Sequence, residues 1–148
     1  MRILVTGSAG FIGYHVAAAL LARGDTVFGL DNFNPYYDAT LKERRNKLLE
    51  SQKEFTLVRG NLEDPATIAH AFQLLKGERV AADTGTRVVH LAAQAGVRHS
   101  IEHPEEFIQS NIVGFHNVIE ACRTHGVGGL IYASTSAVYG DNKEVPFH

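Results

Sequence analysis

The chain has 148 residues, 45% of them hydrophobic and 20% charged, which is enough to bury the core of one domain and excludes a disordered protein. Its 14 basic and 16 acidic residues are dispersed and leave a formal net charge of −2, so neither nucleic acid nor a membrane surface is an expected partner. The single cysteine cannot form an internal disulfide, which fits a reducing compartment, and we expect a cytoplasmic protein.

A glycine-rich turn follows the first predicted strand, at residues 2–6. It reads Gly7-Ser8-Ala9-Gly10-Phe11-Ile12-Gly13 and leads into a helical pattern that ends at Gly24. A backbone that passes a pyrophosphate between strand and helix needs glycine, because it approaches closely and often with positive φ. The helix N-terminus then offers free N–H groups to the phosphates. The turn interrupts the apolar run, so a signal peptide is not expected, and a dinucleotide site is.

The second predicted strand, at residues 26–31, ends in Asp31. A carboxylate there can accept hydrogen bonds from both hydroxyls of an adenosine ribose, and its charge would repel a 2′-phosphate. We therefore expect NAD rather than NADP. The alternative is that Asp31 only begins the turn that continues to Pro35.

The rest of the chain alternates short apolar strands with helical patterns. Helices are predicted at 40–51, 64–76 and 104–125, further strands at 55–60, 87–92 and 129–134, and an irregular stretch at 77–86. Asp64 is the expected N-cap of its helix, with Pro65 at the first helical position. Uniformly apolar strands separated by helices predict a parallel sheet covered on both faces, which is the doubly wound, Rossmann-type α/β fold.

Two of the predicted helices have faces that need interpretation. The helix at 40–51 carries the densest basic cluster, Lys42, Arg44, Arg45 and Lys47, which we interpret as a solvated face. The helix at 104–125 carries two apolar stripes, and such a width predicts packing on the sheet and against a neighbour, such as another subunit. The stripes are Ile108, Ile112, Phe115, Ile119 and Cys122, and Phe107, Gly114, Val118 and Ala121. Cys122 is interpreted as a packing residue.

Residues at the carboxyl ends of the strands are candidate ligand contacts, because ligands of an open parallel sheet lie there. Asn61 and Leu62 follow the third predicted strand. The fourth leads to Leu91, Ala92 and Ala93, whose small side chains leave room for a flat cofactor, although tight packing alone would also favour them.

The fifth predicted strand ends in three hydroxyls, Ser134, Thr135 and Ser136, which could bond a substrate alcohol or simply form a turn or a helix cap. The eight histidines show no spacing typical of metal ligands, so no metal site is expected. His90, inside the fourth strand, is interpreted as a core histidine with a hydrogen-bond partner.

Taken together, these motifs resemble the extended short-chain dehydrogenase/reductase superfamily and its NAD-dependent epimerase/dehydratase family. The strings that carry the resemblance are Thr6-Gly7-x-x-Gly10-Phe11-Ile12-Gly13, His90-Leu91-Ala92-Ala93 and Ser134-Thr135-Ser136-Ala137-Val138-Tyr139-Gly140. Within that family, the segments 31–38 and 94–98 look most like nucleotide-sugar 4-epimerases, and UDP-glucuronate 4-epimerases in particular.

The resemblance implies NAD that is held tightly and oxidises C4 of a nucleotide sugar transiently, with the hydride returned to the other face. It implies cofactor contacts from Gly7, Gly10, Phe11, Ile12, Gly13, Asp31, Asn32, Asn34, Asn61, Leu62, Leu91, Ala92, Ala93 and Ser134. It implies substrate contacts from Gln94, Val97, Arg98 and Ser136. Thr135 matches the catalytic residue that bridges to the sugar oxygen.

The resemblance also predicts an incomplete enzyme. The family places its Tyr-x-x-x-Lys base on a later helix, and residues 1–148 match only the NAD-binding domain, so we expect the fold to stop after the fifth strand and the chain alone to be inactive. Tyr139 and Lys143 match the motif literally, but Gly140-Asp141-Asn142 is turn sequence, and we assign Tyr139 to packing. The full-length family suggests a homodimer.

Three alternatives remain open from the sequence. A nucleotide-sugar 4,6-dehydratase shares the cofactor half but has acidic residues where Ser136-Ala137 stand. A non-catalytic NAD-binding module would also lack the base. An S-adenosylmethionine methyltransferase uses glycine and an acid at similar strand ends, although the Val138-Tyr139-Gly140 string argues against it.

Overall fold

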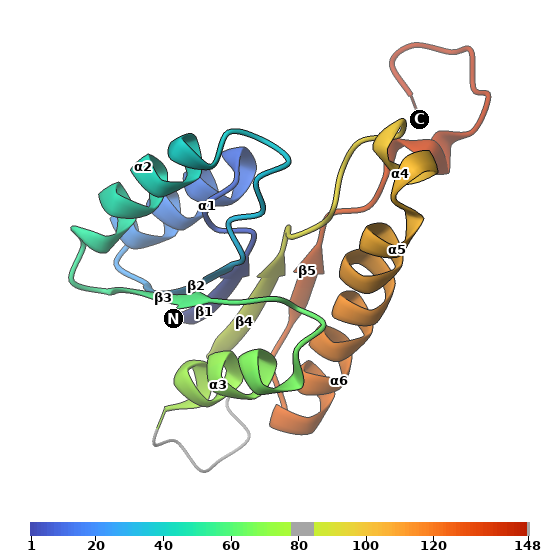
Figure 1. Cartoon of the computed structure of the whole chain (residues 1–148). Coiled ribbons are helices and arrows are strands. Elements are labelled where there is room, and N and C mark those ends of the chain that lie inside the picture. Colours follow the sequence, from blue (N-terminus) through green and yellow to red (C-terminus); the bar gives the residue numbers. More distant parts are fainter. Residues whose placement is uncertain (78–84, 148) are drawn as a thin grey trace.

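The computed structural model describes residues 1–77 and 85–147 (Figure 1). Within them, five parallel strands form one sheet in the order β3-β2-β1-β4-β5. The strands are β1 (Arg2–Thr6), β2 (Thr26–Asp31), β3 (Phe55–Arg59), β4 (Thr86–His90) and β5 (Leu130–Tyr132). Strand β1 is central, with β2 on one side and β4 on the other, so the order reverses direction between β1 and β4.

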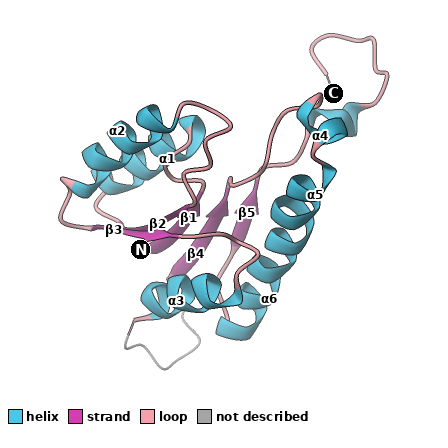
Figure 2. Cartoon of the chain, viewed as in Figure 1, coloured by secondary structure: helices cyan, strands magenta, loops and turns pink. Residues whose placement is uncertain are grey.

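Helices cover both faces of the sheet (Figures 1 and 2). The helices are α1 (Phe11–Ala22), α2 (Ala39–Glu50), α3 (Pro65–Lys76), α4 (His99–Glu102), α5 (Pro104–Phe107) and α6 (Phe115–His125). Under α1 and α2 lies a core that includes Ile3, Val5 and Leu49, and under α3 and α6 lies a larger one that includes Leu4, Phe72 and Val118. Two cores on opposite faces confirm the predicted doubly wound α/β fold.

Local signals set several element boundaries as expected. The carboxylate of Asp64 accepts hydrogen bonds from the backbone N–H groups of Ala66 and Thr67, at 3.0 and 3.2 Å, and Pro65 occupies the first position of α3. Strands β1 and β2 have the predicted bounds. Of the stretch predicted to be irregular, residues 78–84 lie outside the described residues, and Thr86 already belongs to β4.

Four predicted elements were wrong in part. Strand β4 ends at His90 instead of residue 92, β5 covers Leu130–Tyr132 instead of 129–134, and β3 stops one residue before 60. The predicted helix at 104–125 is divided, since residues Ile108–Gly114 between α5 and α6 form a π-helix. In that segment a Cβ on Gly114 would stand 2.6 Å from the Cβ of Leu62, a tertiary contact that local periodicity does not contain.

The two apolar stripes of this region differ in burial. Gly114 and Val118 are buried in the core shared with α3, and Ala121 packs against it. On the other stripe Ile108 and Ile112 are 50% and 64% exposed. The stripe with Gly114, Val118 and Ala121 therefore performs the predicted sheet packing, while Ile108 and Ile112 of the other stripe are open to solvent. No helix in the described parts of the chain has the length and apolar character to cross a bilayer.

Candidate functional site

A cavity of about 550 Å³ opens beyond the carboxyl ends of β1, β2 and β4, where the strand order reverses. Predicted site residues that line it are Gly7, Gly10, Phe11, Ile12, Gly13, Asp31, Asn32, Asn34, Leu62, Leu91, Ala92, Ala93 and Gln94. The structure thus brings the glycine turn, the acidic end of β2 and the small residues after β4 around one space.

The glycine turn lies so close to neighbouring backbone that side chains would not fit at Gly7 and Gly13. Gly7 has φ of 71° and donates its N–H to the carbonyl of Leu30 at 2.7 Å. A Cβ at Gly7 would stand 2.9 Å from the backbone nitrogen of Ala92, and one at Gly13 would overlap the carbonyl of Gly7. Among the described residues, no side chain caps α1 at Gly10, so the N–H groups of its first turn remain available to an anionic ligand.

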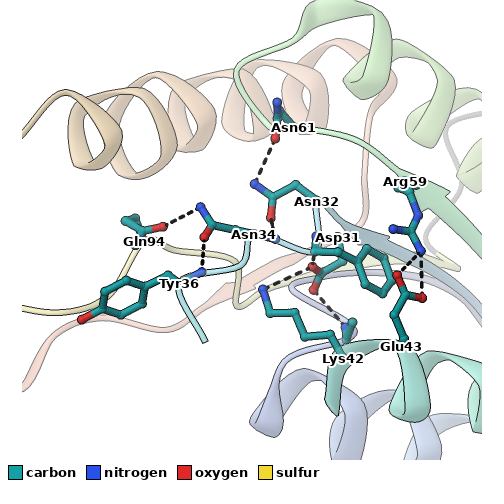
Figure 3. Close-up of polar contacts among 11 residues, drawn as sticks. Asp31, Asn32, Asn34, Tyr36, Lys42, Glu43, Arg59, Asn61 and Gln94 are labelled. Carbon is teal, nitrogen blue, oxygen red and sulfur yellow. Dashed lines mark hydrogen bonds and ion pairs between the residues drawn. The ribbon is translucent and has the colours of Figure 1, made fainter. Parts of the chain in front are cut away.

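Asp31 is 5% exposed and fixed by two backbone donors (Figure 3). Its Oδ2 accepts a hydrogen bond from Ala9 N at 3.0 Å, and its Oδ1 accepts one from Phe33 N at 2.8 Å. An ionised carboxylate has about four acceptor positions, so the side chain keeps acceptor capacity toward the cavity. The alternative, in which Asp31 only begins a turn, accounts for the bond from Phe33 N. It does not account for the bond from Ala9 N or for the position of Asp31 in the wall of the cavity.

The loop after β2 is tied to its neighbours by amide side chains (Figure 3). Asn32 donates to the Oδ1 of Asn61 at 2.9 Å, and Asn34 donates to the Oε1 of Gln94 at 3.2 Å. Gln94 is itself fixed by Asn111, which exchanges hydrogen bonds with its backbone N–H and carbonyl at 2.7 and 2.9 Å. Asn61 does not line the cavity, but it contacts Asn32, which does.

The start of the segment after β4 is anchored on Thr6. The Thr6 Oγ1 accepts the N–H groups of Leu91 and Ala92 at 3.1 and 3.2 Å, which uses both lone pairs, so its O–H donates to the Nδ1 of His90 at 2.8 Å. Burial lowers the pKa of His90 to about 4, and its ring stacks on Phe115 at 5.0 Å. His90 is the satisfied core histidine that was predicted.

Besides Asn61, five predicted site residues lie outside the cavity. Val97 and Arg98, just before α4, are exposed, as are Ser134, Thr135 and Ser136 after β5. Of this last segment it is Ala133 that lines the cavity. The Thr135 Oγ1 accepts the backbone N–H of Ala137 at 3.2 Å and caps a 3-10 helix, Ser136–Tyr139. A strand that ends at Tyr132 leaves these hydroxyls beyond the sheet.

Two further interpretations are supported by the structure. The 3-10 helix ends at Tyr139, and Gly140 has φ of 60°, so Tyr139 and Lys143 do not share a helix face. The Tyr139 ring stacks on Phe147 at 4.9 Å. Cys122 is half-buried against the larger core, and burial raises its pKa to about 11, which suits packing and not nucleophilic chemistry.

The interpretation of the basic cluster on α2 as a solvated face was wrong for two of its members. Lys42 and Arg45 both line the cavity, and the Lys42 side chain is only 16% exposed. Their i,i+3 spacing places them on one face of α2, which was the available signal. Tyr36 and Ser110 also line the cavity without having been predicted. Within residues 1–77 and 85–147, no group of three His, Cys, Asp or Glu side chains is placed to hold a metal ion.

Comparison with known proteins places the chain in a family. A sequence model described as GDP-mannose 4,6 dehydratase matches residues 4–148. UDP-glucuronate 4-epimerase 3 of Arabidopsis thaliana is 47% identical over 98% of this chain and 32% of its own length. The probable UDP-glucuronate 4-epimerase of Rhizobium meliloti is 44% identical over 99% of this chain and 41% of its own length.

Solved structures of similar proteins agree with these sequence relatives. The Bacillus cereus UDP-glucuronic acid 4-epimerase in complex with UDP-glucuronic acid and NAD has a TM-score of 0.81 and 33% identity, over 97% of this chain and 43% of that one. The Thermus thermophilus UDP-glucose 4-epimerase in complex with NAD has a TM-score of 0.77 and 37% identity, over 98% of this chain and 41% of that one. The chain thus spans less than half the length of the relatives it matches. With the family model covering nearly its whole length, the chain belongs to the GDP-mannose 4,6 dehydratase family, within the extended short-chain dehydrogenase/reductase superfamily that its motifs resemble.

Proposed function

We propose that this chain is the NAD-binding part of a nucleotide-sugar 4-epimerase of the UDP-glucuronate to UDP-galacturonate type. The observation that carries the proposal is the single cavity in which the glycine turn meets Asp31 and the small residues Ala92 and Ala93. Relatives that bear the UDP-glucuronate 4-epimerase name at 44–47% identity support the substrate class. The chain spans only part of the length of these relatives, so the activity of the whole protein is also proposed here.

The residues around the cavity fit a dinucleotide. The uncapped first turn of α1 would bind the pyrophosphate, and the remaining acceptor capacity of Asp31 would bind the adenosine ribose hydroxyls. Asn32 and Asn34 would line the ribose side, with Asn61 and Leu62 beside the adenine. Leu91, Ala92 and Ala93 would form the floor below the nicotinamide half, with Ser134 near it. Bound NAD would supply a reversible acceptor for the hydride on C4 of the sugar.

The chain's own residues would then position the sugar. Gln94, Val97, Arg98 and Ser136 are proposed substrate contacts, and the Thr135 O–H, which its capping bond leaves free to donate, would bond the C4 oxygen. We propose that a further segment supplies the Tyr-x-x-x-Lys base and the sugar-binding part, with residues 1–148 as the NAD-binding domain. We further propose a cytoplasmic homodimer; the single cysteine supports the compartment.

A 4,6-dehydratase remains the second candidate, because the matching family model carries that description. The sequence after the proposed bridging hydroxyl argues against it. This chain has Ser136 and Ala137 at the positions where a 4,6-dehydratase is expected to have acidic residues.

Calorimetric titration of NAD, followed by UDP-glucuronate, tests the proposal. We expect NAD to bind, and UDP-glucuronate to bind the NAD-loaded protein once the completing segment is joined to the chain. Ala93→Leu should weaken NAD binding, because Ala93 lines the cavity, whereas Ala66→Leu on the exposed face of α3 should not. Absence of NAD binding would reject the proposal, and NAD binding with no response to the sugar nucleotide in the completed protein would favour a non-catalytic module.

A further inference from the structure

A lysine on α2 lies beside Asp31, the carboxylate proposed to select the cofactor. Figure 3 shows Lys42 extending from α2 toward Asp31, and its Nζ is 3.8 Å from the Asp31 Oδ1. The side chains are 16% and 5% exposed, so both charges are largely shielded from solvent. Arg45, three residues further along α2, lines the same cavity.

The contact between Lys42 and Asp31 leaves both groups open to a ligand. At 3.8 Å it is an ion pair without a hydrogen bond, because such bonds need about 2.7–3.2 Å. The ammonium group has three donors and the carboxylate keeps acceptor capacity beyond its two backbone bonds. An oxygen of a ligand could therefore accept from Lys42 while a neighbouring hydroxyl donates to Asp31.

The other acidic side chains near Lys42 or in the cavity lining bond to other groups or belong to other segments. Glu43, next to Lys42, pairs with Arg59 through two contacts of 2.8 and 3.0 Å. Asp38 lines the cavity but accepts from Thr40 at the start of α2. Glu63, which also lines the cavity, comes from the loop after β3. Among the described residues, Lys42 is the charged side chain that forms an ion pair with Asp31. Its positive charge opposes the repulsion by which an aspartate rejects a 2′-phosphate.

We propose that Lys42, assisted by Arg45, allows this cavity to accept the 2′-phosphate of NADP beside Asp31, so that Lys42 sets how strongly the protein discriminates NAD from NADP. The inference rests on the proposed dinucleotide function and extends it, since Asp31 alone would select NAD. It makes Lys42 a specificity-determining residue of the cofactor site.

Equilibrium titration of the whole chain with NAD and with NADP tests this. Lys42→Met retains most of the side-chain length and removes the charge, and Lys47→Met makes the same change at an exposed position of α2 that does not line the cavity. We expect Lys42→Met to weaken NADP relative to NAD by about tenfold, and Lys47→Met to leave the ratio of the two dissociation constants unchanged. A shift of about threefold or less in Lys42→Met overturns the inference, and a larger one supports it.

The wild-type protein provides a second measurement if Lys42→Met does not fold. Added salt should weaken NADP binding more steeply than NAD binding, because screening removes the extra attraction of Lys42 for the 2′-phosphate. Parallel salt dependences, or a relative gain of NADP affinity with salt, would overturn the inference while leaving the proposed function intact. Failure to bind either dinucleotide would reject both.

Discussion

The carboxylate of Asp31 accepts a hydrogen bond from the backbone N–H of Ala9 at 3.0 Å, across 22 positions of sequence. The bond joins the end of β2 to the glycine turn, and a second bond, from Phe33 N at 2.8 Å, joins the same side chain to the following loop. The residue proposed to bind the ribose therefore also fixes the distance between two walls of the cavity. Changes at this position should affect folding as well as binding.

Asp31→Asn tests this double role. An amide offers one oxygen and one NH2 group, so one of the two buried N–H donors would face another donor. We expect the free energy of unfolding to fall by about 1–3 kcal/mol in urea titrations and NAD binding to weaken. Asp141→Asn, at an exposed position, controls for the loss of a carboxylate. An unchanged stability of Asp31→Asn would show that the Ala9 and Phe33 bonds contribute little.

Replacing Gly7 by alanine tests the close approach of the glycine turn to the segment after β4. Gly7 and Gly126 both have positive φ, of 71° and 62°, so alanine is strained at each, by about 1–2 kcal/mol. A Cβ at Gly7 would in addition meet Ala92 N at 2.9 Å, whereas no atom of the described residues lies within 4 Å of a Cβ built at Gly126. Thermal or urea unfolding should therefore show Gly7→Ala to be less stable than Gly126→Ala by about 1–3 kcal/mol. Equal losses of stability in the two variants would mean that the glycine turn and the segment after β4 can move apart at little cost.

His90 should make the protein sensitive to acid. Its pKa is lowered from 6.5 to about 4 by burial, so below pH 6.5 the unfolded chain binds a proton that the folded one does not, and stability is lost as pH falls from 6.5 toward 4. The depression corresponds to a loss of about 3 kcal/mol at the acid end of this range. Unfolding of wild type and His90→Gln should be measured between pH 7 and pH 4.

The variant should show a shallower loss of stability with acid than the wild type, whatever its stability at pH 7. His70→Gln, on the exposed face of α3, controls for the removal of one imidazole. Identical slopes for wild type and His90→Gln would contradict the assignment of a neutral, buried imidazole.

The two stripes of the α5–α6 region should respond differently to truncation. Val118 is fully buried in the larger core, and Val118→Ala should lower the free energy of unfolding by about 2 kcal/mol through lost burial and a cavity. Ile112, which is 64% exposed, should tolerate Ile112→Ala with a loss below about 0.5 kcal/mol. A comparable loss at Ile112 in dilute solution would show that this stripe is covered, for example by a second copy, and light scattering would then detect the assembly.

Features that depend on adjacent residues were predicted well. The bounds of β1 and β2 follow from apolar runs that end at a glycine turn and at Asp31, and the start of α3 follows from Asp64 and Pro65. The division of the region 104–125 was missed. Its π-helix lies where Asn111 bonds Gln94 and Gly114 meets Leu62, and neither contact leaves a periodic signal along the chain.

The sequence by itself determined the fold class, the glycine turn and the acid at the end of β2, because strand, helix and turn preferences are set by neighbours along the backbone. Only the tertiary structure decided that Lys42 lies beside Asp31, that Arg45 lines the cavity and that Thr135 caps a 3-10 helix outside it. Which face of α2 meets the cavity depends on how α2 packs over α1 and β3, and periodicity alone makes a basic face look solvated. The cavity joins walls from distant parts of the chain, so its electrostatics arise from packing.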